Sequence, residues 1–320
     1  MRRAAMLAIL GLVLTTCIVA SACGEKNANA DVAVQFASAS PAASASAPAP
    51  IKDQTSIPPP QLVLSTLTVP QGGAILVSVV GSVTGGSIGF LGRTYQLAQG
   101  AKSMYSFVGV APEDPVGPAK VAVQFTMTNG TKGTLVDDVT VEKTQWTVDS
   151  LEFNGETEQL ADPKVLAADQ DKLQGIYRRA TPKKLWDGPW QMPVDGKITA
   201  KFGEQRSVDG GPVSGHHPGS DIGVAVGTDV RAPNSGTVSF TGQLQAYGNV
   251  IVIDHGGGLY STFGHLSEIG VHEGQAVKTG DIIGKSGNTG LSTGPHLHWE
   301  MAIDGVLIDA TKLVDGTDGV

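Results

Sequence analysis

The chain has 320 residues, enough for two ordinary domains once its ends are set aside. Its formal net charge is −8, so it lacks the basic surface of nucleic-acid-binding proteins, and we expect no nucleic acid partner. Glycine is frequent, with 42 residues, while aromatic residues make up 5%, and this composition favours turn-rich β structure.

The N-terminus carries the features of a secretory signal over residues 1–23. Arg2 and Arg3 precede an almost wholly apolar stretch, which ends in the small residues Ala20-Ser21-Ala22 before Cys23. A positive segment, an apolar run and small residues at a cleavage site predict export. Small residues directly before Cys23 also resemble the lipobox of bacterial lipoproteins, which implies cleavage before Cys23 and a lipid on its sulfur.

Two alternatives to the lipid anchor stay open. Cleavage after Ala22 would release the protein, whereas an uncleaved segment would hold it in the membrane, because the apolar run approaches the ~20 residues that span a bilayer. The sequence therefore predicts an extracytoplasmic lipoprotein, anchored in the membrane at the cell surface or in the periplasm, with full secretion as the alternative. Since Cys17 and Cys23 are the only cysteines, any metal in the folded part is held by His and carboxylate ligands.

Residues 24–60 predict a disordered linker. Ala, Ser and Pro dominate its second half, and Pro58-Pro59-Pro60 closes it. Such a segment buries too little apolar surface to fold, and its prolines favour extended conformations. Behind a lipid anchor, it would act as a stalk.

Residues 61–150 predict a small all-β accessory domain. Short apolar runs lie at 74–80 and 105–110, and apolar and polar residues alternate at 121–127. Asn129-Gly130 then gives a strong hairpin signal. Several short strands at this spacing favour a β-sandwich. This domain has no polar constellation suited to chemistry, so we expect a spacer or docking module.

Residues 151–189 predict a helical connector with one helix. Asp162 is a candidate N-cap, Pro163 suits the first helical position, and Thr181-Pro182 ends the pattern. The apolar positions near one helical face are Val165, Leu166, Leu173, Ile176 and Tyr177. This face allows packing on the domain at either side.

Residues 190–320 have a different character and contain all seven histidines. Short β-branched runs alternate with Gly turns, at 236–240, 249–254, 282–286 and 296–303. Within the last run, His296 and His298 are two apart, so strand periodicity puts both rings on one face and Leu297 on the other. Two imidazoles side by side are costly unless their lone pairs are used, as by a divalent metal. Either ring could ligate while the other points at what the metal activates.

His217 and Asp221 add an imidazole and a carboxylate, with Pro218-Gly219 between them. The glycine permits an unusual backbone, so that a short loop can aim both groups at one point. Two His and one Asp with one open position is the pattern of catalytic zinc sites. Zinc lowers the pKa of water in that open position to about 7.

The segment from His217 to Asp309 resembles the lysostaphin-type, LytM-like zinc endopeptidases. The motifs that carry the resemblance occur in order as HPGSD (217–221), APNSG (232–236), YGNVIVIDHG (247–256), GHL (264–266) and GNTGLSTGPHLHWE (287–300). No metal-site position is substituted. The resemblance implies a zinc-dependent endopeptidase that cleaves peptide cross-links or stem peptides of bacterial peptidoglycan through a metal-activated water. The resemblance does not identify which peptide bond is cleaved.

The resemblance also implies roles for single residues. His217, Asp221 and His298 would bind Zn²⁺. His265 and His296 would flank the metal-bound water, as general base and as donors to the tetrahedral oxyanion.

The implied fold is mainly β, with the accessory β-sandwich-like domain followed by an antiparallel β-sheet domain of the duplicated hybrid motif type. The site would lie in a groove with the loops 204–216 and 287–295 as walls. Because residues 204–215 are Gly-rich with few large side chains, we expect a flexible wall there.

The other histidines, His216, His255 and His272, are expected to be hydrogen-bonded turn or loop residues outside the site. Competing functions are a non-catalytic relative that activates another wall hydrolase, and a carbohydrate-binding module built on the accessory domain. A carrier of phosphohistidine on a related fold is disfavoured, because a secreted protein has no cytosolic phosphodonor.

Overall fold

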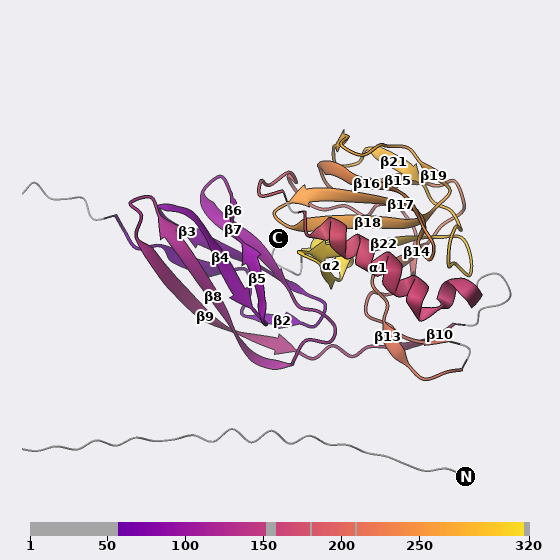
Figure 1. Cartoon of the computed structure of the whole chain (residues 1–320), viewed down its shortest axis with the longest axis horizontal. Coiled ribbons are helices and arrows are strands. Elements are labelled where there is room, and N and C mark those ends of the chain that lie inside the picture. Colours follow the sequence, from indigo (N-terminus) through magenta and orange to yellow (C-terminus); the bar gives the residue numbers. More distant parts are fainter. Residues whose placement is uncertain (1–56, 152–157, 180, 209, 317–320) are drawn as a thin grey trace, which may run out of the picture. The chain divides into compact units, whose positions relative to one another are not determined.

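The computed structural model describes residues 57–151, 158–179, 181–208 and 210–316 (Figure 1). The expected signal segment, Cys23 and the linker up to residue 56 lie outside the described residues. Among the residues that are described, no helix is both long and apolar enough to cross a membrane.

The N-terminal part is a β-sandwich, as predicted. One sheet has the order β1 (Gln61–Leu64), β3 (Ala74–Val80), β7 (Ser103–Gly109) and β6 (Ala98–Gln99). The other has the order β2 (Thr68–Pro70), β9 (Lys132–Glu142), β8 (Gly117–Met127), β4 (Val83–Phe90) and β5 (Arg93–Gln96). In β8, Val121 and Val123 are fully buried, and the alternate residues Ala122 and Gln124 are more exposed. This period of two shows that Val121 and Val123 lie on the face toward the core.

The connector contains a short 3-10 helix, η1 (Glu158–Ala161), and the helix α1 (Pro163–Tyr177). The Asp162 carboxylate accepts a hydrogen bond from Lys164 N, so the predicted N-cap is confirmed. Leu166 departs from the predicted apolar face, because its side chain is 40% exposed. The reason is that α1 buries the narrower stripe of Asp169, Leu173, Ile176 and Tyr177.

The C-terminal part is built on an antiparallel sheet. Its strand order is β11 (Lys197–Ala200), β14 (Ser220–Gly223), β22 (His296–Ile303), β18 (Leu259–Leu266), β17 (Gly248–Gly256), β16 (Gly236–Leu244) and β20 (Ala276–Val277). Strand β23 (Val306–Ile308) pairs with β22. A smaller sheet contains β15 (Asp229–Arg231), β21 (Ile282–Lys285) and β19 (Glu268–Ile269), and α2 (Ala310–Asp315) follows β23. The predicted mainly β fold class is confirmed.

Helix α1 packs on this sheet (Figure 1). Leu173, Ile176 and Tyr177 form one apolar cluster with residues of β16, β17, β18 and β22, among them Val250 and Tyr260. The Asp169 carboxylate accepts hydrogen bonds from the backbone N–H groups of Gln245 and Ala246, at 3.2 and 2.6 Å. The helix is therefore fixed to the sheet by apolar packing and by a buried polar contact.

The segment expected to be a flexible wall contains strands instead. Strand β12 (Gln205–Val208) pairs in parallel with β10 (Val148–Leu151) and in antiparallel with β13 (Ser214–His216). The distant β10 supplies the hydrogen-bonding partner that the local sequence does not reveal. Beside it, the Trp146 ring lies 5.5 Å from the His216 ring, measured between centroids.

Candidate metal centre

Sheet register brings the predicted ligands together. Strand β22 lies between β14 and β18, and Asp221 of β14 stands directly opposite His298 of β22. On the other side of His298 is Gly264, the residue before His265. Leu297 is fully buried on the opposite face of the strand, as the alternation predicts. His298 is therefore the central member of the site.

The third predicted ligand, His217, comes from the turn between β13 and β14. Gly219 allows this turn because a Cβ there would lie 2.5 Å from the Trp299 carbonyl oxygen and 2.9 Å from His298 Cε1. The expectation of an unusual backbone at Gly219 is wrong, since this residue is not among those with positive φ. The glycine is needed for close approach of the turn to β22.

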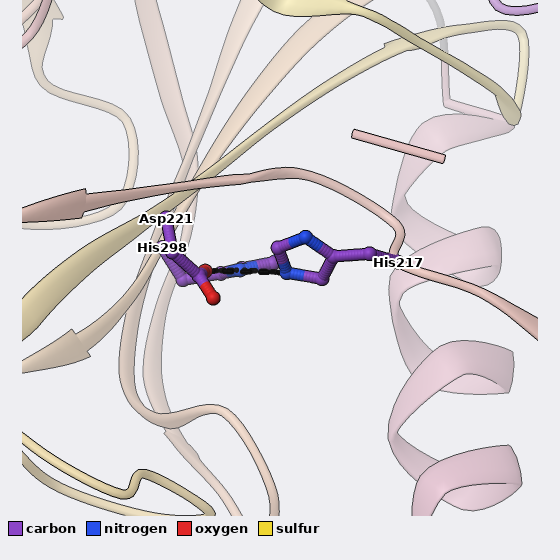
Figure 2. Close-up of side chains that lie close together, drawn as sticks. All are labelled: His217, Asp221 and His298. Atoms are coloured by element: carbon purple, nitrogen blue, oxygen red, sulfur yellow. Dashed lines mark hydrogen bonds and ion pairs between the residues drawn. The ribbon is translucent and has the colours of Figure 1, made fainter. Parts of the chain in front are cut away.

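His217, Asp221 and His298 converge on one point (Figure 2). Asp221 Oδ1 lies 2.7 Å from His298 Nδ1 and 3.2 Å from His217 Nε2, and the two ring nitrogens are 3.3 Å apart. One ligand atom from each of the three residues lies within 4.8 Å of the others. Such a group could hold a metal ion.

The hydrogen bonds on the far side of each ring show which lone pairs face this point. His217 Nδ1 lies 2.9 Å from the Lys201 carbonyl oxygen, which can only accept, so this nitrogen carries the proton. His298 Nε2 similarly donates to Glu300 Oε1 at 3.0 Å. In the neutral rings, His217 Nε2 and His298 Nδ1 therefore direct lone pairs at Asp221 Oδ1. Two imidazole nitrogens and a carboxylate oxygen with no hydrogen between them fit a divalent metal ion.

The pKa shifts of His298 and Asp221 show that the cluster favours a positive charge. Burial lowers the pKa of His217, whereas for His298 the contacts with Asp221 and Glu300 outweigh burial and raise the pKa to about 9. Burial alone would raise the pKa of Asp221, but His217 and His298 hold it well below its usual value. The cluster thus attracts a cation, either a proton or a metal ion.

His265 and His296 line the same site. Their ring centroids are 4.7 Å apart, and the His265 and His298 centroids are 5.7 Å apart. His265 Nδ1 donates to the Thr289 carbonyl and His296 Nδ1 to the Gly294 carbonyl, each at 2.7 Å. In the neutral form of each ring, Nε2 is therefore the acceptor.

The backbone and the pKa of His265 are both unusual. Its φ of 59° is in the left-handed region, which is sparsely populated for residues other than glycine. Burial, together with the charges of His298 and His296, lowers its pKa to about 3. At neutral pH this imidazole is therefore uncharged and retains its Nε2 lone pair.

The remaining histidines lie outside this cluster, among the described residues. His216 Nδ1 bonds to the Gly203 carbonyl at 2.7 Å. His255 is fully buried and contacts the Ser235 carbonyl and the Ser261 hydroxyl. His272 is exposed and interacts with the carbonyl of the neighbouring Glu273.

Sequence reasoning missed the residues that surround the ligands. Glu300 holds His298, and Tyr177 and Tyr247 in turn contact Glu300. Arg206 lies 3.6 Å from Asp221 Oδ2 and is paired with Asp149 at 2.9 Å. One signal was available, because Glu300 continues the period of two begun by His296 and His298.

Comparison with known proteins identifies the domain. The model of peptidase family M23 matches residues 215–310. Peptidoglycan DD-endopeptidase ShyA of Vibrio cholerae is 39% identical over 144 residues, which are 44% of this chain and 31% of ShyA. Outer membrane antigenic lipoprotein B of Haemophilus influenzae is 35% identical over 124 residues, 38% of this chain and 28% of that protein. The chain thus spans less than a third of the length of either relative.

A solved structure extends the likeness beyond this segment. A Pseudomonas aeruginosa crystal structure assigned to peptidase M23 has a TM-score of 0.58 and 25% sequence identity, and covers 76% of this chain and 93% of that chain. The four predicted site histidines and Asp221 all lie inside the segment that the family model matches. Residues 215–310 of this chain therefore form a domain of peptidase family M23.

Proposed function

We propose that this protein is a zinc-dependent endopeptidase that hydrolyses peptide bonds of bacterial peptidoglycan. The observation that carries the proposal is the set of three lone pairs, on His217 Nε2, Asp221 Oδ1 and His298 Nδ1, directed at one point beside two further imidazoles. The peptidoglycan DD-endopeptidase activity in the name of ShyA supports the choice of substrate.

In this proposal, His217, Asp221 and His298 hold zinc, which when bound polarises a carbonyl and lowers the pKa of water. His265 and His296 do the proton chemistry. Water attacks the carbonyl carbon of the scissile bond, and its proton passes to Nε2 of one of these rings. The protonated ring then donates a hydrogen bond to the tetrahedral oxyanion and keeps its proton, which it afterwards transfers to the departing amine nitrogen.

The fixed tautomers support this assignment. The Thr289 and Gly294 carbonyls accept hydrogen bonds from Nδ1 of His265 and His296, so Nε2 is the acceptor in the neutral form of each ring. The low pKa of His265 prevents the ring from being protonated by solvent at neutral pH. The Nε2 lone pair of His265 is therefore present before the reaction begins.

The test is digestion of purified peptidoglycan by the full-length chain, with and without a chelator, followed by mass spectrometry of the released muropeptides. We expect new peptide ends that disappear with the chelator and return when zinc is added. The bond is identified by the masses of the fragments. Absence of cleavage by protein that holds one zinc per chain would overturn the proposal and favour an activator of another hydrolase.

We further propose that the chain is exported and carries a lipid on Cys23, because small residues precede that cysteine directly after an apolar run. The lipoprotein among the relatives supports this location. Metabolic labelling with a radioactive fatty acid in a bacterial host should label the wild type, and the Cys23→Ser variant should stay unlabelled. Equal labelling of both would exclude Cys23 as the attachment site.

A further inference from the structure

We propose that helix α1 is part of the metal centre, because Tyr177 holds Glu300, and Glu300 in turn positions His298 for the metal. The inference rests on the proposed zinc site. It concerns a helix that lies before residues 215–310, the segment matched by the family model. Tyr177 and Glu300 are positioning residues in this scheme, since the group that could hold a metal ion contains neither of them.

The first step concerns Glu300 and His298. Glu300 is fully buried, and its Oε1 accepts the His298 Nε2 proton at 3.0 Å. This hydrogen bond leaves the lone pair on Nδ1 and fixes the plane of the ring, as carboxylates do for ligating histidines in metalloproteins. If this carboxylate rotated, His298 could lose its orientation, or could turn its protonated nitrogen toward Asp221.

The second step concerns what holds Glu300. Its Oε1 also accepts the Tyr247 hydroxyl at 2.5 Å, and its Oε2 accepts the Tyr177 hydroxyl at 3.2 Å. Tyr177 is fully buried, and its hydroxyl lies 2.7 Å from Thr262 Oγ1. With the Tyr177 proton directed to the carboxylate, Thr262 is the donor in that pair. The chain of hydrogen bonds therefore runs from Thr262 through Tyr177 to Glu300.

The two carboxylate oxygens of Glu300 thus accept hydrogen bonds from tyrosines in different parts of the chain. Tyr247 belongs to the turn between β16 and β17, within the matched domain, whereas Tyr177 comes from the last turn of α1. Burial and the neighbouring Glu300 raise the pKa of both tyrosines well above the usual value, so both hydroxyls remain donors across the neutral range. Tyr177 is then the donor that fixes Oε2, and α1 fixes Tyr177.

A purely structural role for Tyr177 would give a different result, and the chain offers a matched control. Tyr260 is also buried, and its ring centroid is 5.4 Å from that of Tyr177. Its hydroxyl has no hydrogen-bond partner among the described residues. Tyr177→Phe and Tyr260→Phe therefore each remove one buried hydroxyl from the same cluster, but only the first removes a contact with Glu300.

The experiment is competition of the full-length chain with a chromophoric chelator for Zn²⁺, with the visible spectrum of the Co²⁺-loaded protein as a second readout. We expect Tyr177→Phe to raise the zinc Kd by about three- to tenfold and to shift the cobalt bands. Glu300→Gln, one step nearer to the metal, should raise the Kd by about 10- to 100-fold. Tyr260→Phe should leave both the Kd and the spectrum unchanged.

The outcomes separate the two proposals. If the wild type binds no zinc, the proposed function fails. If the wild type binds zinc and Tyr177→Phe binds it with the same Kd, or if Tyr260→Phe weakens binding equally, the role of α1 is overturned. If Tyr177→Phe does not fold, Thr262→Val tests the same hydrogen-bond chain from the other end, and an unchanged Kd there would count against the proposal.

Discussion

His296 and His298 stand two residues apart on β22, yet they offer different ring nitrogens to the site. His296 is held at Nδ1 by the Gly294 carbonyl, and His298 at Nε2 by Glu300. His298 Nδ1 lies 2.7 Å from Asp221 Oδ1, while His296 Nε2 is 3.6 Å from the same oxygen. The shorter approach and the carboxylate behind His298 favour it as the ligand.

This difference predicts separate effects of two substitutions. His298→Ala should abolish both zinc binding and hydrolysis, because it removes one of the three proposed ligands. His296→Ala should retain most of the zinc and lose activity by about 100-fold or more, as expected for a group that transfers protons. Metal analysis and muropeptide release would be measured on the same samples, with the exposed His272→Ala as control. Equal zinc loss in both variants would contradict the assignment.

Single residues also show what the sequence could predict. Spacing alone placed His296 and His298 on one face of a strand and left open which of them ligates. The roles of the three proposed ligands and of the two flanking histidines came from the resemblance of short ordered motifs to a known family. Tyr177 and Arg206 were missed because each depends on packing between elements that are distant in the chain. Leu166 was placed on the wrong face, since helical periodicity does not tell how wide a stripe the sheet will cover.

The buried carboxylate of Asp304 makes the stability of the fold depend on pH. Asp304 is in the turn between β22 and β23 with φ of 47°, and burial raises its pKa to about 6. The folded state therefore binds this proton more tightly than the unfolded chain does. The resulting stabilisation is present below the unfolded value near 3.8 and is lost as pH rises through about 6.

Asp304→Asn should therefore stabilise the protein at neutral pH. Asn tolerates a left-handed backbone and carries no charge to bury. We expect a gain of about 1–3 kcal/mol in the free energy of unfolding at pH 7.5, and little change at pH 4. Urea unfolding of both proteins at the two pH values would measure this, with the exposed Asp137→Asn as control. A gain of equal size at both pH values would rule out the buried charge as the cause.

At the scale of elements, β10 brings a negative charge toward the metal centre. Asp149 of β10 pairs with Arg206 of β12 at 2.9 Å, and the other Arg206 nitrogen, Nη2, lies 3.6 Å from Asp221 Oδ2. Asp149 thus offsets a guanidinium charge that would otherwise repel a bound cation. Strand β12, in the segment expected to be a flexible wall, thus contacts the proposed ligand Asp221 through Arg206.

Asp149→Asn should weaken zinc binding by about three- to tenfold, because it leaves the Arg206 charge uncompensated near the cation and loosens the Arg206 side chain. The matched control is Asp138→Asn, which breaks an exposed pair with Lys120 in the β-sandwich. Zinc competition at low and high salt would measure the effect, which should shrink as salt screens the charges. An unchanged Kd at low salt would contradict the role of β10.

At the scale of the whole molecule, the segment 215–310 that the family model matches leaves out helix α1, which shares an apolar core with the sheet. Leu173, Ile176 and Tyr177 of α1 cover an apolar face of the sheet that includes Val250 and Val252. A fragment of residues 190–320 would expose this face, at a loss of roughly 1.5–3 kcal/mol for each buried side chain removed. The fold class was predictable from strand periodicity, but this dependence was not, because the helix could have packed on either side.

We therefore expect the fragment 158–320 to unfold at a higher urea concentration than the fragment 190–320. The shorter fragment should also bind more of a dye that reports exposed apolar surface. Equal unfolding midpoints and equal dye binding for the two fragments would show that α1 adds nothing to the stability of the sheet.

The position of β22 has a consequence for when the site can come into being. This strand is inserted between β14 and β18, and it brings His298 to Asp221 across 77 positions of sequence. A chain made or folded only as far as β18 contains Asp221 and His217, but the sheet is still open where the last ligand belongs. Because synthesis proceeds from the N-terminus, an incomplete copy is left without a competent centre. If the site binds zinc as proposed, only a chain that includes β22 can bind it.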